Sequence, residues 1–189
     1  MTQILKVRGL SGSDIERISI KDLEIFDPEC LEVPKSLCVW QTYDMLDHFG
    51  IETMVVEDLS AEGMCFVNKG VVTIALNNDT YDGCCDDNPR DRFTVSHEIC
   101  HALHHGKYLL DGCEFTSAFY RHSEVKPYED PEWQAHRYAS ALLMPAKMVC
   151  KVLDNPDSMF APEILMEKFE VSYTAATKRI QNLKKMRIL

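Results

Sequence analysis

The chain has 189 residues, of which 46% are hydrophobic and 26% are charged, and its net charge is −10. This composition excludes a disordered chain and suits one domain with a buried core, while the acidic balance argues against nucleic acid and anionic membranes as partners. No stretch approaches the ~18 apolar residues that span a bilayer, and the N-terminus carries no secretory signal, so we expect a soluble protein of the cytoplasm.

The first third of the chain predicts helices. Residues 13–26 form either an early helix or an irregular extension, and the pattern leaves both open. Residues 34–49 predict a helix with helically spaced apolar side chains. Pro34 suits its first turn, and Gly50 suits its end.

A small sheet should follow. Residues 51–59 predict a strand, and residues 63–77 predict a β-hairpin that turns at 68–70, where the sequence is Asn-Lys-Gly. Residues 78–89 then predict a loop. Its aspartates lack the spacing of a calcium-binding loop, so we interpret them as a solvated turn; they are Asp79, Asp82, Asp86 and Asp87.

Eight cysteines are scattered without C-x-x-C pairs. This spacing predicts free thiols rather than a disulfide framework or a cysteine-built zinc site. The adjacent pair Cys84 and Cys85 raises the alternative of a redox latch or an additional metal ligand. Because adjacent cysteines bridge only with strain, plain reduced thiols are the preferred interpretation.

A long helix is predicted from Asn88, its cap, through Pro89 in the first turn to a stop at Gly106. It carries the motif H-E-x-x-H at residues 97–101. The alternative is an amphipathic helix that is rich in histidine by chance.

His97 and His101 lie four residues apart, so they share one face of a helix, about 6 Å apart along its axis, and both imidazoles can reach one ion. Glu98 lies to one side of the pair, where a carboxylate base can activate a water beside the ion. His104 and His105 follow, but His104 is about 10 Å along the axis from His97, too far to bind the same ion from a straight helix. We therefore interpret both as solvated histidines or as supports of the site.

The third ligand should come from a second helix, because the longer pattern H-E-x-x-H-x-x-G-x-x-H is absent: position 104 is His and position 107 is Lys. The candidate is Glu132, in the helix predicted between Pro131 and Pro145. His136 lies on the same face and could instead be a ligand, a supporting residue or a transition-state donor. Glu129 and Asp130 are weaker competitors in the preceding loop.

These two segments, RFTVSHEICHALHHG and EWQAHRYASALLMP, resemble the ImmA/IrrE family of zinc-peptidase-like proteins, and the resemblance extends over about residues 35–183. It implies His97, His101 and Glu132 as zinc ligands and Glu98 as the catalytic glutamate. It also implies a zincin-like α+β fold, in which a small sheet packs on the H-E-x-x-H helix and helices follow to the C-terminus. The family's known role is cytoplasmic proteolysis of helix-turn-helix repressors in mobile elements and stress responses.

Three positions depart from the family pattern. Cys100 replaces a glycine, His136 an asparagine and Tyr138 a phenylalanine. The first two changes could alter the choice of metal or the geometry of the site.

The predicted organisation is an N-terminal extension over residues 1–34, a metallopeptidase domain over 35–150 and a helix-turn-helix-like segment over 151–189 packed on the same domain. The last segment has a basic bias and a predicted apolar core, which consists of Ile164, Leu165, Phe169, Ala175, Ala176, Ile180 and Leu183. One interpretation is DNA contact and another is substrate docking, but a packing subdomain with a solvated basic face is preferred, because the patch is short on an acidic chain. The basic residues are Lys178, Arg179, Lys184, Lys185 and Arg187.

The sequence thus supports two hypotheses. The first is a zinc endopeptidase that cleaves a protein, a transcriptional repressor by family resemblance, with the oxyanion partner left open among His136, His122 and Tyr138. The second is a metal-stabilised module that binds a partner or senses a signal without cutting.

Overall fold

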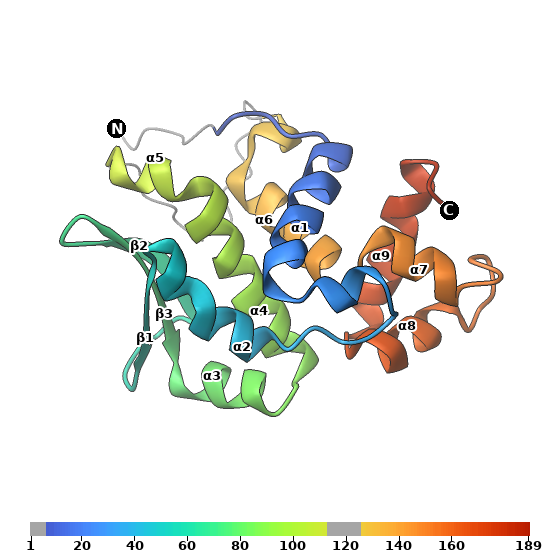
Figure 1. Cartoon of the computed structure of the whole chain (residues 1–189), viewed down its shortest axis with the longest axis horizontal. Coiled ribbons are helices and arrows are strands. Elements are labelled where there is room, and N and C mark those ends of the chain that lie inside the picture. The colour runs from blue at the N-terminus through green and yellow to red at the C-terminus, as the bar shows by residue number, and fades with distance from the viewer. Residues whose placement is uncertain (1–6, 113–125) are drawn as a thin grey trace.

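The computed structural model describes residues 7–112 and 126–189. A small sheet lies at one end of the molecule, three helices lie at the other end, and three further helices run between them (Figure 1). The helices are α1 (Gly12–Phe26), α4 (Pro89–Cys100) and α6 (Pro131–Leu143) in the middle, and α7 (Ala146–Val152), α8 (Ala161–Phe169) and α9 (Tyr173–Lys185) at the far end.

The early segment whose structure the sequence left open is a helix, α1. Its cap, Ser11, and Asp14 form a reciprocal capping box, in which each side chain accepts a hydrogen bond from the amide of the other residue. Ile15, Ser19 and Leu23 repeat every four residues and are buried on one face, which packs against α6. The segment assigned to an N-terminal extension therefore contributes to the core.

The next helix, α2 (Val39–Asp44), starts later than predicted. It continues as the 3-10 turn η2 (Met45–Phe49) and ends, as expected, at Gly50, whose φ is 72°. The predicted start near Pro34 was wrong because residues 34–38 stay outside the helix. In this segment, Ser36 and the carbonyl of Leu37 accept hydrogen bonds from a distant arginine, Arg92, instead of forming a first helical turn.

The sheet confirms the predicted strand and hairpin. Its strands are β1 (Glu52–Val56), β2 (Gly63–Asn68) and β3 (Val71–Asn77), in the order β1-β3-β2. The first runs parallel to β3, and β2 runs antiparallel to it. Lys69 and Gly70 form the turn with φ of 49° and 84°, the positive values that a two-residue hairpin of this hand requires. The chain is therefore α+β with a mixed sheet, and β2 is an edge strand.

The predicted loop over residues 78–89 was wrong, because it contains α3 (Asn78–Cys85). Asn77 caps this helix by accepting from the amide of Thr80 at 2.8 Å. Thr80 and Cys84 are buried on one face, and the Tyr81 ring packs on Tyr43. Tertiary packing thus holds a helix whose aspartate-rich sequence is typical of a turn.

The C-terminal helices α8 and α9 form the predicted helix-turn-helix pair, with Glu170 in the left-handed region at their junction. Ile164 was wrongly placed in the core, since it is 41% exposed. Five of the other predicted core residues are buried: Leu165, Phe169, Ala176, Ile180 and Leu183.

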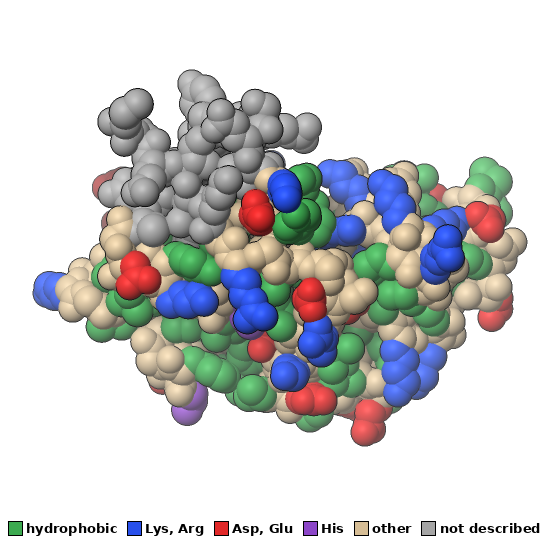
Figure 2. All heavy atoms as spheres, turned by 90° about the horizontal axis from the view of Figure 1, so that it is seen from above, with side chains coloured by type: hydrophobic (Ala, Val, Ile, Leu, Met, Phe, Trp, Pro, Cys, Tyr) green, Lys and Arg blue, Asp and Glu red, His purple; other side chains and the backbone are tan. Residues whose placement is uncertain are grey.

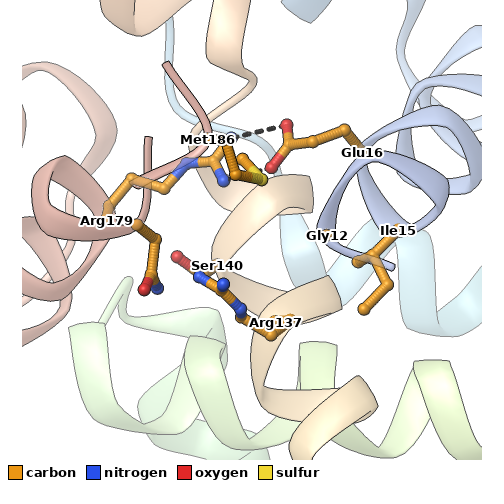
Figure 3. A pocket seen from close by; sticks show the side chains of 8 residues that line it. Gly12, Ile15, Glu16, Arg137, Ser140, Arg179 and Met186 are labelled. Atoms are coloured by element: carbon orange, nitrogen blue, oxygen red, sulfur yellow. Dashed lines mark hydrogen bonds and ion pairs between the residues drawn. The ribbon is translucent and has the colours of Figure 1, made fainter. Parts of the chain in front are cut away.

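The predicted basic patch loses Arg179, which is buried between α1, α6 and α9. Its guanidinium forms a two-pronged ion pair with Glu16 (Figure 3), with Nη2 to Oε2 at 2.8 Å. Its Nε donates to the carbonyl of Met144 at 2.9 Å. The face seen in Figure 2 carries Lys and Arg side chains scattered among acidic and apolar ones. Arg179 is therefore a packing residue.

The cysteines agree with the prediction of free thiols over the described residues. All seven of them are unbridged, and Cys113 lies outside the described residues. Cys84 is buried and Cys85 is exposed. Within residues 7–112 and 126–189, none of the helices combines the length and the apolar character that crossing a bilayer requires.

Candidate metal centre

Helix α4 places the H-E-x-x-H motif, and it begins where the sequence predicts. Asn88 caps it by accepting from the amide of Arg90 at 3.0 Å, and Pro89 occupies the first turn. Val95 and Ile99 are fully buried and seat the helix in the core, where it packs on α6. The opposite side of this helix carries His97 and Glu98.

Arg92 locks the first turns of α4 in place. Its side chain is fully buried, and its Nη2 donates to Ser36 Oγ at 2.5 Å and to the Leu37 carbonyl at 2.8 Å. Its Nη1 donates to the carbonyls of Phe169, at 3.1 Å, and Glu170. Burial lowers the pKa of Arg92 from its usual value, but these acceptors compensate the charge. One side chain thus joins α4 to the segment before α2 and to the α8–α9 junction.

The motif helix does not end at Gly106, contrary to the prediction. It widens into a π-helical turn, η3 (His101–His105), and continues as α5 (Gly106–Leu110). Gly106 has a helical φ of −52°, and a Cβ there would come within 3.1 Å of Val72 on β3. The glycine therefore permits close packing on the sheet rather than a helix stop. The chain leaves the helix at Gly112, with φ of 85°.

Three side chains from α4, η3 and α6 converge. The Nε2 atoms of His97 and His101 are 3.0 Å apart. Glu132 places its two carboxylate oxygens 3.2 Å from these nitrogens, one facing each histidine. One possible ligand atom from each of the three residues lies within 4.8 Å of the others. The structure therefore brings together His97, His101 and Glu132, the three residues singled out from the sequence.

Glu132 reaches the histidines from the first turn of α6. Asp130 caps that helix by accepting from the Glu132 amide at 3.0 Å. Partial burial opposes the carboxylate charge, but the neighbouring imidazoles of His101 and His97 outweigh it and lower the pKa of Glu132. The carboxylate is therefore held in its charged form, as a metal ligand must be. Glu129 lies before the helix, in the short turn η4 (Pro127–Glu129).

Glu98 stands beside this triad. Burial raises the pKa of Glu98 above its usual value, although His101 and His97 oppose the shift. The start of β2 abuts it, since a Cβ on Gly63 would lie 3.0 Å from Glu98 Cγ. Over the described residues, no protein group forms a hydrogen bond with its carboxylate. A raised pKa and free oxygens suit a group that exchanges protons.

His136 lies next to the triad but is not one of its members. Its ring stacks on Phe93, with centroids 5.8 Å apart, and meets His97 edge-on at 4.7 Å. Burial of the ring and the nearby His97 lower the pKa of His136, although Glu132 opposes the shift. Tyr138, another suggested oxyanion partner, instead donates its hydroxyl to Asp22 at 2.6 Å. The third suggestion, His122, lies outside the described residues.

The two histidines after the motif have different surroundings. His104 is paired through Nε2 with Asp22 of α1 at 2.7 Å. His105 is fully buried, so the interpretation of a solvated residue was wrong for it. Burial lowers the pKa of His105 to about 3. Its ring contacts His101, so it belongs to the support of the site.

Two contributors were missed by the sequence analysis. Gln134, which contacts His105, is a buried polar residue of α6, two positions after Glu132. A buried glutamine two residues after a ligand gives no distinctive sequence signal. Asp22 lies about 80 residues upstream in α1, and nothing in the sequence relates it to His104.

Comparison with known protein families shows the family to which the chain belongs. Residues 83–181 match the family model described as the IrrE N-terminal-like domain, a peptidase family. This match covers more than half of the 189 residues. The chain belongs to this family. The resemblance seen in the sequence is therefore confirmed, and both the IrrE-like helices that carry the triad fall within the match. No curated protein matches the chain.

The donor set of this IrrE-like domain fits a divalent cation. Two imidazole nitrogens and a carboxylate converge from three elements, and each carboxylate oxygen faces a ring nitrogen. Lone pairs that face one another at this distance repel unless a cation or a proton lies between them. The arrangement is thus a candidate His-His-Glu metal site.

Proposed function

We propose that the protein is a zinc-dependent endopeptidase with a zincin-like catalytic domain. His97, His101 and Glu132 would hold the ion, and Glu98 would be the catalytic base. The observation that carries this proposal is the convergence of the three donors beside an unpaired, partly buried carboxylate. Two nitrogen ligands, one oxygen ligand and an open fourth position are typical of catalytic zinc.

Bound zinc would supply Lewis acidity, which polarises a carbonyl and lowers the pKa of water towards ~7. Glu98 then accepts a proton from the attacking water on its carboxylate and passes it to the leaving amide nitrogen. The raised pKa of Glu98 favours both transfers, because it brings the proton affinity of the carboxylate closer to neutrality. His136, whose ring meets His97 edge-on, would be the partner of the substrate oxygen in this proposal.

The free edge of β2 supports a polypeptide as the substrate. Over residues 7–112 and 126–189, this strand pairs with β3 on one side only, and its first residue, Gly63, packs against Glu98. An extended peptide can pair with an exposed strand edge through its main-chain groups, which places a peptide bond beside the catalytic base. Membership of the IrrE-like family supports a helix-turn-helix transcriptional repressor as the protein cleaved, in the cytoplasm.

The experiment that tests this function is a survey of new protein N-termini in host cells that express wild-type protein or Glu98→Gln at equal levels. Termini that appear only with wild type support a peptidase and identify the cleaved bond. Glu129→Gln, a change of a glutamate that lies outside the triad, is the matched control and should behave as wild type.

The same survey addresses a non-proteolytic module that acts by binding. If wild type and Glu98→Gln give identical termini under inducing stress, with bound metal verified in both, peptidase activity is refuted. His97→Ala is less informative, because loss of the metal can also unfold the protein.

A further inference from the structure

The side chain of Gln134 is buried and has a determined orientation. Its amide nitrogen lies 2.9 Å from the carbonyl oxygen of Arg8 and 2.7 Å from that of Tyr128. Because carbonyl oxygens only accept hydrogen bonds, the group that faces them must be the NH2 group. The amide oxygen, which only accepts, therefore faces His105.

This orientation determines which nitrogen of His105 carries the proton. Its Nε2 lies 3.0 Å from the Gln134 oxygen and must donate to it. A neutral His105 then has a bare Nδ1, which lies 3.1 Å from Nδ1 of His101. Of these two atoms, Nδ1 of His101 is therefore the one that donates. His101 is thereby left with its lone pair on Nε2, the nitrogen that faces Glu132 and His97.

We infer that Gln134 and His105 are positioning residues, which fix the tautomer and the ring orientation of His101 for metal binding. This inference rests on the proposed metal site. A ligating histidine generally donates its other ring nitrogen to a partner that holds it in place, and loss of that partner weakens metal binding. Here the partner is a second histidine, held in turn by a glutamine and two main-chain carbonyls.

Hydrogen bonds orient one of the two histidines of the candidate site, His101, but not the other, over the part of the chain that the structure describes. Over the described residues, Nδ1 of His97 is buried and has no hydrogen-bond partner. His101 is therefore the ligand whose orientation the protein controls through hydrogen bonds, while His97 is held by ring contacts with His101 and His136.

The hydrogen bonds that run from the carbonyls of Arg8 and Tyr128 through Gln134 and His105 to His101 form a relay. The two carbonyls at its end are themselves fixed by backbone pairing. The amide of Val7 donates to the carbonyl of Glu129 at 3.1 Å, and that of Leu10 donates to Tyr128 at 2.9 Å. Residues 7–10 thus run beside the turn that precedes Glu132. The N-terminal segment becomes part of the support of the metal site through Gln134.

The first test reads the tautomers in the metal-free wild-type chain with 15N-labelled histidine, through two-bond 1H–15N couplings. We expect the proton of His105 on Nε2 and a proton on Nδ1 of His101. A His105 whose proton resides on Nδ1, or a His101 that carries its only proton on Nε2, overturns the relay. No variant has to fold for this measurement.

The second test is a double-mutant cycle on zinc affinity, measured by competition with a chromophoric chelator. Gln134→Leu and His105→Phe should each weaken zinc binding roughly 10-fold or more. Because Gln134 acts through His105, Gln134→Leu should cause no further loss in the His105→Phe protein. Equal losses in both backgrounds would reduce Gln134 to a packing role and overturn the relay. Gln181→Leu, an exposed glutamine on α9, is the control and should bind as wild type.

The two readouts separate this inference from the proposed function. A wild-type chain that binds no zinc refutes the metal site, while the tautomers still decide whether the relay exists. A wild-type chain that binds zinc and a Gln134→Leu chain that binds it equally well refute the relay alone.

Discussion

At the scale of single residues, Glu132 closes the triad from a different helix than the two histidines. Replacing it with alanine removes one of three converging donors, so Glu132→Ala should weaken zinc binding by more than the 10–100-fold that loss of a supporting hydrogen bond typically costs. Chelator competition measures this. Glu129→Ala, in the turn just before the helix, should leave the affinity unchanged, and an equal loss in both variants would contradict the assignment of Glu132.

His105 predicts how the stability of the metal-free protein varies with pH. Its pKa is about 3 in the folded state against about 6.5 for an unfolded histidine. Between these values the unfolded chain binds one more proton, so the free energy of unfolding should fall as the pH falls through this window. One proton contributes up to about 1.4 kcal/mol per pH unit.

Urea denaturation at several pH values between 4 and 7 tests this dependence. His105→Phe should have a shallower slope than wild type. His48→Phe, a change of an exposed histidine, should retain the wild-type slope. Parallel curves for wild type and His105→Phe would show that His105 does not titrate as its burial implies.

The sequence predicted the residues that converge at the candidate site better than the residues that surround them. The spacing of His97, Glu98 and His101 on one helix follows from helical geometry alone, and the family resemblance selected Glu132 over its neighbours. The roles of His105 and Gln134 depend on a π-helical turn and on the packing of α6. Neither feature has a sequence pattern that distinguishes it from an ordinary amphipathic helix.

At the scale of elements, the start of β2 requires a residue without a side chain. A Cβ at Gly63 would lie 3.0 Å from both Glu98 and Leu76. Gly63→Val should therefore displace Glu98 and lower peptidase activity more than tenfold, while zinc affinity changes little because the three ligands are untouched. Activity on a peptide substrate and chelator competition, measured on the same preparation, separate the two effects.

The matched change on the same strand is Met64→Val, at an exposed position. It should preserve both activity and zinc affinity. If Gly63→Val were fully active, Glu98 would have room to adapt, and the close packing of β2 against Glu98 would not be needed for activity.

Elements with strong local signals were predicted correctly, and those fixed by distant contacts were not. The hairpin has its Lys-Gly turn, and α4 and α6 have their capping residues and first-turn prolines. The start of α2 and the existence of α3 depend on Arg92 and on packing around Tyr81, which no local pattern records. Tertiary contacts outweighed local propensity at both places.

At the scale of the whole molecule, the Glu16–Arg179 pair joins the two ends of the chain over the core helix α6. Both side chains are largely buried, with 12% and 2% exposed. Removing one partner of such a pair leaves a buried charge and typically costs roughly 3–5 kcal/mol. Glu16→Ala should therefore lower the free energy of unfolding by several kcal/mol, as measured by urea denaturation.

An exposed pair provides the comparison. Asp157, in the ion pair with Lys184, is 83% exposed, so Asp157→Ala should change stability by less than about 1 kcal/mol. Similar losses in Glu16→Ala and Asp157→Ala would mean that the pair across the core is no stronger than one in solvent.

The π-helical turn at His101–His105 also determines the direction in which the side chains of the next helix, α5, point. A π-helical turn holds one more residue than an α-helical turn, and each residue of a regular helix adds about 100° of rotation. Deleting a single residue there, such as Ala102, would rotate α5 by about that angle. Tyr108, which accepts from the Arg8 amide, and Leu109, buried in the core, would then point elsewhere. The number of residues between His101 and α5 is therefore constrained, and related chains should vary in residue type at positions 102 and 103 more readily than in the length of this turn.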